Sequence, residues 1–171
     1  MSTATRVVDP MIAKFDQEAL TTQRFLERVP ADRLTWRPHP KSMTLGQLAL
    51  HVATLAGGVS NFLEIESFDV SDANFEPDQP GSKDEIMQKF GEFQALAKAR
   101  LEALDDNRAS SEWKMMKGDD QLMSVPKLGL VRSIMFNHLY HHRGQLSVYL
   151  RLLDIPVPVA YGKSADENPF A

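Results

Sequence analysis

Three of the five histidines of this chain lie within residues 138–142. His138 and His142 are four residues apart, so on a helix they share one face, with Cβ atoms about 5–6 Å apart. Two imidazoles in this arrangement can bind one metal ion together. A further histidine, His51, lies in another segment with a helical period, close to the centre of its apolar side. The sequence therefore brings three imidazoles to the apolar sides of two expected helices.

Three imidazoles in the interior of a helical protein must each satisfy two ring nitrogens, and shared binding of a divalent metal does so favourably. Imidazole suits zinc, nickel, iron or copper, and three protein ligands leave a position open for water or substrate. A structural zinc site would use four protein ligands. We therefore predict a catalytic type of metal site at His51, His138 and His142. The alternative interpretation is that these are core histidines hydrogen-bonded to other protein groups.

A different pair of histidines could also bind the metal, because His138 and His141 are close enough on a helix to share one ion. His142 is preferred because it lies nearer the centre of the apolar stripe. His141, Gln145 and Tyr149 flank this pair, and we predict that they support the ligands or line a substrate pocket.

Other side chains of the same segment lie away from the predicted ligands. Arg132, Arg143, Ser147 and Arg151 are expected on the solvent side. Leu139, Leu146 and Leu150 form a second apolar stripe, which either mediates dimerisation or faces a neighbouring helix of the same chain. His39 lies between two prolines in a polar loop, and we expect it to be exposed.

Apolar residues with a helical period and good capping signals predict helices in four segments. Asp9, followed by Pro10, is the expected N-cap of the first, Thr44 of the second and Ser82, with Glu85 three residues later, of the third. The expected helices span residues 9–28, 44–62, 82–104 and 124–153. On the third, Ile86, Phe90, Phe93, Leu96, Ala97 and Leu101 are expected to face inward.

These segments predict one all-α domain over residues 1–171, a four-helix bundle followed by a non-helical tail at 154–171. The connectors at 29–43, 66–82 and 105–124 are long, which predicts at least one crossover between parallel helices. Trp36 is expected to anchor the first connector. Residues 105–124 fit either a hairpin with Gly118-Asp119 at its tip or an irregular loop.

The composition excludes several classes of function. A net charge of −4 and a pI near 5.7 give no electrostatic basis for binding nucleic acid or an anionic membrane. No apolar run approaches a membrane span or a signal peptide, and we expect a cytoplasmic protein. Without cysteine, any thiol chemistry requires a thiol carried by a ligand.

Several motifs together resemble the DinB-like (DinB/YfiT) superfamily of four-helix-bundle metalloproteins. They are Trp-Arg-Pro-His-Pro-Lys-Ser at 36–42, Thr-Leu-Gly-Gln-Leu-Ala-Leu-His at 44–51, Asn-His-Leu-Tyr-His-His-Arg-Gly-Gln-Leu at 137–146, and the stretch at 150–167. The metal-binding histidines of that family match His51, His138 and His142. The resemblance implies an up-down-down-up bundle, one zinc or nickel ion per chain and a homodimer.

Known enzymes of the family use low-molecular-weight thiols as cosubstrates, so the resemblance also implies a small-molecule substrate. Our leading hypothesis is a metal-dependent enzyme of thiol S-transferase or hydrolase type, in which the metal activates a bound thiol or water. The alternative is a non-catalytic, metal-stabilised scaffold or stress-response protein. An open coordination position beside a pocket would favour the enzyme.

Overall fold

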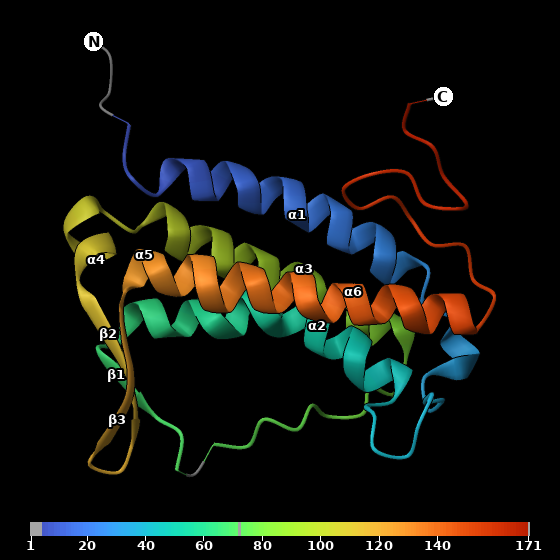
Figure 1. Cartoon of the computed structure of the whole chain (residues 1–171), viewed down its shortest axis with the longest axis horizontal. Coiled ribbons are helices and arrows are strands. Elements are labelled where there is room, and N and C mark those ends of the chain that lie inside the picture. The colour runs from blue at the N-terminus through green and yellow to red at the C-terminus, as the bar shows by residue number, and fades with distance from the viewer. Residues whose placement is uncertain (1–4, 72, 171) are drawn as a thin grey trace.

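The computed structural model describes residues 5–71 and 73–170, which are mostly helical. The long helices are α1 (Asp9–Glu27), α2 (Leu45–Ser60), α3 (Lys83–Glu102) and α6 (Asn137–Leu152). In Figure 1, α1 and α6 run in one direction and α2 and α3 in the opposite direction. No helix among the described residues combines the length and apolarity needed to cross a membrane.

Helix α6 is the end of a longer continuous helical segment that starts at Lys127. The segment begins as α5 (Lys127–Leu130), widens into a π-helical turn (Val131–Phe136) and continues as α6. We predicted that this helix begins near residues 124–126; it begins at Lys127, directly after Pro126, and residues 124–126 form the end of a strand. The strand ends at Pro126, so strand and helix follow each other without an intervening loop.

The prediction of an all-α chain is wrong in one respect, because a small three-stranded sheet lies at one end of the helices (Figure 1). Strand β1 (Ser67–Asp69) pairs in parallel with β2 (Glu112–Lys117), which pairs antiparallel with β3 (Asp120–Pro126). Residues 105–124 thus contain the hairpin, preceded by a short helix, α4 (Asp106–Ser110). Gly118 at the hairpin tip has a φ of +57°, a conformation that glycine adopts without steric cost.

Side chains cap two of the long helices as predicted. Thr44 Oγ1 accepts a hydrogen bond from Gln47 N at 3.1 Å, and the Gln47 side chain accepts one from Thr44 N at 3.0 Å. Ser82 Oγ accepts a hydrogen bond from Glu85 N at 3.1 Å. The predicted cap at Asp9 is wrong, because Val8 is the N-cap of α1. The Asp9 carboxylate instead accepts hydrogen bonds from the backbone and side chain of Arg6.

The core lies between the long helices and extends under the sheet, where Trp113 is fully buried against Phe62. Helices α2 and α3 approach closely at Gly57, where an added Cβ would lie 2.7 Å from the Phe93 side chain. Leu139, Leu146 and Leu150 of α6 are all buried in this core. The second stripe of α6 therefore packs within the chain and is no surface for dimerisation.

The prediction that Leu96 of α3 faces inward is wrong. Its side chain is 37% exposed, because α3 packs on its neighbours through Ile86, Phe90, Ala97 and Leu101. Trp36 does anchor the first connector: its ring packs edge-to-face on Tyr149, with centroids 5.7 Å apart. The described part of the tail is non-helical, as predicted, and Glu167 pairs there with Arg24 of α1.

Candidate metal centre

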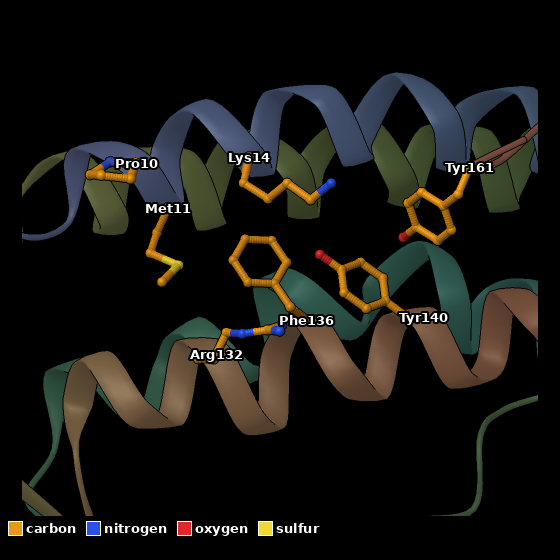
Figure 2. Close-up of a pocket in the computed structure, with 7 residues that line it drawn as sticks. All are labelled: Pro10, Met11, Lys14, Arg132, Phe136, Tyr140 and Tyr161. Atoms are coloured by element: carbon orange, nitrogen blue, oxygen red, sulfur yellow. The ribbon is translucent and has the colours of Figure 1, made fainter.

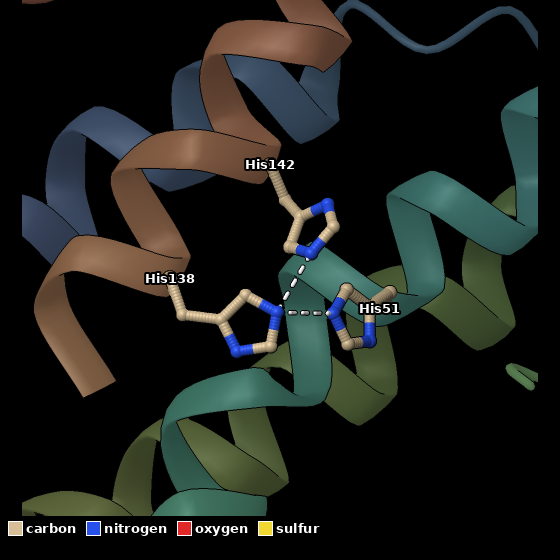
Figure 3. Close-up of side chains that lie close together, drawn as sticks. All are labelled: His51, His138 and His142. Atoms are coloured by element: carbon tan, nitrogen blue, oxygen red, sulfur yellow. Dashed lines mark hydrogen bonds between the residues drawn. The ribbon is translucent and has the colours of Figure 1, made fainter. Parts of the chain in front are cut away.

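The imidazoles of His51, His138 and His142 converge between α2 and α6 (Figure 3). The Nε2 atoms of His51 and His138 are 3.4 Å apart, and those of His138 and His142 are 2.7 Å apart. One nitrogen from each of the three rings lies within 4.8 Å of the other two. The structure thus brings together the three residues that we predicted as metal ligands.

These separations fit a single metal ion. Zinc–nitrogen bonds of about 2.0–2.1 Å in tetrahedral geometry require nitrogens about 3.3 Å apart. The His51–His138 separation of 3.4 Å is close to this value, and the His138–His142 separation of 2.7 Å is about 0.6 Å shorter. Among the described residues the group contains three histidines and no carboxylate, so one tetrahedral position is left without a protein ligand.

The electrostatics of the site keep the imidazoles neutral. Burial between the helices, reinforced by the two neighbouring imidazoles, lowers the pKa of His51 to about 4. Burial likewise lowers the pKa of His138 and of His142. A metal ligand must be the unprotonated imidazole, so all three side chains are in the form that binds a metal at neutral pH.

Gln145 lies one turn after His142 and contacts it directly. Its Oε1 lies 2.7 Å from His142 Nδ1, and this oxygen can only accept a hydrogen bond. Nδ1 therefore carries the proton, and Nε2 keeps its lone pair directed at the other two histidines. Gln145 selects the tautomer of His142 that can bind a metal through Nε2.

We predict that Gln145→Leu lowers the affinity for a divalent metal by about 10- to 100-fold, because His142 loses the acceptor that fixes its tautomer and ring orientation. Competition titration with a chromophoric chelator would measure the change. Gln145→Glu is the matched control, since it keeps an acceptor at the same distance along the side chain and should preserve the affinity. A leucine variant with the affinity of the wild type would contradict this role.

His141 and Tyr149, the other two residues predicted beside the ligands, do not point at the place where the three imidazoles meet. His141 is exposed, and its ring packs edge-to-face against His142 with centroids 4.8 Å apart. The Tyr149 hydroxyl donates a hydrogen bond to the Met43 carbonyl at 3.2 Å, so it holds the connector before α2. His39 is exposed, as predicted.

The position of Arg143 was predicted wrongly. Instead of facing solvent, it is 2% exposed and forms an ion pair with Glu18 of α1, with Nη2 and Oε2 2.6 Å apart. The helical angle placed Arg143 away from the histidines, but the element on that side is α1 and not water. The available signal was Glu18 itself, an acidic residue one turn from the inward-facing Phe15 and Thr22.

A cavity of about 430 Å³ adjoins the histidines on the side of His51. Leu50, Thr54 and Phe93 line it from α2 and α3, and residues 74–78 of the connector between these helices complete it. Gln47 fixes this connector by donating a hydrogen bond to the Pro77 carbonyl at 3.1 Å. The cavity is large enough for a small molecule and lies beside His51, one of the candidate metal-binding residues.

A bundle in which two facing helices direct three neutral imidazoles at one point belongs to the class of helical proteins with a candidate divalent-metal site. The family model that matches the chain is more specific. It is that of the DinB family and covers residues 1–168, so this chain belongs to the DinB family.

Solved structures agree with this assignment at the level of the fold. A DinB-like protein from Bacillus cereus superposes with a TM-score of 0.68 at 21% sequence identity, covering 87% of this chain and 94% of that chain. A DinB-like protein from Bacillus subtilis superposes with a TM-score of 0.67 at 18% identity, covering 88% and 96%. A search of curated protein sequences found no match.

Proposed function

We propose that the chain is a metal-dependent enzyme that holds one divalent ion, zinc or nickel, at His51, His138 and His142. The reaction would be of thiol S-transferase or hydrolase type on a small-molecule substrate. The observation that carries the proposal is the convergence of three neutral imidazoles beside a cavity. The family resemblance supports a homodimer with a low-molecular-weight thiol as cosubstrate, and we include both in the proposal.

In this proposal the histidines, Gln145 and the cavity walls have separate roles. His51, His138 and His142 bind the ion, and Gln145 orients His142. Leu50 and Phe93 give the adjoining cavity apolar walls that exclude water from a bound reactant. When bound, the ion lowers the pKa of a thiol or water, so that the nucleophilic anion is present at neutral pH.

A second candidate function is a metal-stabilised scaffold without catalysis. One observation favours it: the three imidazoles come from α2 and α6, so an ion there would cross-link two helices that are far apart in sequence. The two candidates differ in what the ion does once bound. A scaffold needs the ion only for stability, whereas an enzyme must also turn over a substrate.

A conjugation screen tests the enzyme proposal. Glutathione, bacillithiol, mycothiol and cysteine would each be offered with generic electrophiles, and 4-nitrophenyl esters would report hydrolysis. We expect turnover by the zinc- or nickel-loaded protein with at least one pair, and a loss of about 100-fold or more in His142→Ala. The control is His141→Ala, which removes an exposed imidazole from the same turn. Turnover that survives in His142→Ala would overturn the metal mechanism.

A further inference from the structure

A second groove lies on the side of α6 that faces away from the histidines (Figure 2). Tyr140 is two residues from both His138 and His142, which is about 200° of helical rotation. The groove has a volume of about 450 Å³ and runs between α1, the π-helical turn and the tail. Its lining residues are Pro10, Met11, Lys14, Arg132, Phe136, Tyr140 and Tyr161.

Positive charge exceeds negative charge at this groove. Lys14 and the buried Arg143 behind it share a single carboxylate, Glu18, with nitrogen–oxygen distances of 2.6 Å each. Arg132 adds a third cation, which donates a hydrogen bond to the uncharged side-chain oxygen of Asn137 at 3.1 Å. Lys14, Arg132 and the buried Arg143, with the one carboxylate of Glu18, give the groove and the layer behind it a net charge of +2.

The Arg132–Asn137 contact depends on the π-helical turn. In a regular α-helix, residues five apart lie about 140° from each other around the axis. The wider turn over Val131–Phe136 brings the two side chains to the same side. Such turns occur frequently at functional sites, and this one sets the position of Arg132 at the edge of the groove.

The groove also presents a hydroxyl group suited to an anion. The Tyr140 hydroxyl points into the groove in Figure 2 and makes no hydrogen bond with any described residue. A phenol hydroxyl can donate a hydrogen bond to an anion placed in the groove. The Tyr161 hydroxyl is already engaged, since it donates to Glu18 Oε2 at 3.0 Å and accepts from Arg143 Nη2 at 2.5 Å.

The remaining walls are apolar. Met11 and the rings of Tyr140 and Tyr161 are partly or largely exposed along the groove, and Phe136 closes its floor. An inorganic anion would leave these surfaces uncovered, whereas an uncharged ligand would leave the excess positive charge uncompensated. Both features are satisfied by a molecule with one anionic end and an apolar body.

We propose that this groove binds a small organic carboxylate with an apolar body. The carboxylate accepts hydrogen bonds from Tyr140 and Lys14, with Arg132 adding charge at the rim, and the body packs on Met11 and Phe136. This site is separate from the metal centre and does not depend on the proposed function.

Calorimetric titration of the full-length, chelator-treated protein with 3-phenylpropionate tests the proposal. We expect a Kd of roughly 0.1–1 mM, as suits a ligand of this size. The uncharged analogue 3-phenylpropanamide should bind at least about tenfold more weakly, because the groove cations lose their partner. Inorganic phosphate should bind at least about tenfold more weakly as well, because it leaves the apolar walls uncovered.

Two variants locate the site. Tyr140→Phe removes one oxygen and keeps the ring, and it should weaken binding about five- to tenfold. Arg132→Gln should weaken it about threefold to fivefold, as expected for an exposed charge. Lys41→Gln, which removes an exposed charge from a distant connector, should bind like the wild type, and circular dichroism would verify the fold of each variant.

Several results would overturn the proposal. One is equal affinity for the acid and its amide, or for phosphate. Another is unchanged affinity in both Tyr140→Phe and Arg132→Gln. A third is binding that is lost in His51→Ala or that requires added metal, which would place the carboxylate at the metal centre. An absence of binding at 10-fold the upper expected Kd, about 10 mM, would also overturn it.

Discussion

Replacing His138 by alanine is expected to abolish metal binding. The wild type, purified with zinc or nickel and dialysed, should carry about one ion per chain, and the variant should carry less than about one-tenth of an ion. His138 lies between the other two ligands, with its Nε2 2.7 Å from that of His142 and 3.4 Å from that of His51. Without it, the two remaining imidazoles give an incomplete site. Elemental analysis measures the stoichiometry.

The control for this experiment is His141→Ala, which should retain the full metal content. The same comparison decides between the two pairings in the histidine cluster, because a site built from His138 and His141 would lose its metal in the control as well. Bound metal should also raise the free energy of unfolding, by about 4 kcal/mol when the free ion exceeds its Kd a thousandfold. A wild type that purifies without metal and gains no stability from it would contradict the site.

The second large effect is expected at Glu18. Glu18→Gln should lower the free energy of unfolding by about 3 kcal/mol or more, because it leaves the Arg143 guanidinium buried without a carboxylate. Both side chains are 2% exposed, and Thr22 and Tyr161 complete the hydrogen bonds of the pair. Urea denaturation of the metal-free protein would measure the loss.

A matched control lies on the same helix. Asp16 pairs with Lys98 at 2.8 Å, but these side chains are 47% and 43% exposed. Asp16→Asn should therefore cost less than about 1 kcal/mol, because water screens the exposed pair and solvates the remaining charge. If both variants lost the same free energy of unfolding, burial of the Glu18–Arg143 pair would not make that pair more important for stability than an exposed pair.

The convergence of the three histidines could be predicted because its main signals are local. The spacing of His138 and His142 determines their shared face on any helix, and the apolar neighbours of His51 indicate which side of its helix is buried. The caps at Thr44 and Ser82 depend equally on residues three positions apart. The cavity beside His51 could not be predicted, since it depends on where residues 74–78 pass over α2.

The features that were missed depend on partners distant in sequence. Strand β1 has three residues, and its pairing with β2 joins segments on either side of α3. The burial of Arg143 depends on Glu18, 125 residues earlier. Leu96 has an apolar side chain at a helical period, but the neighbouring helices do not cover it. A helical period predicts the direction in which each side chain leaves the helix axis. It does not predict whether solvent or another helix lies in that direction.

The π-helical turn at Val131–Phe136 has a consequence for how this family member tolerates insertions and deletions. Lys127, at the start of the segment, is held by hydrogen bonds to Leu63 and Ser111, whereas His138 and His142 beyond the turn must meet α2. Loss of one residue within the turn would rotate one of these ends by about 100° relative to the other. The length of the turn therefore sets the direction in which His138 and His142 leave the helix relative to the end of the segment held at Lys127.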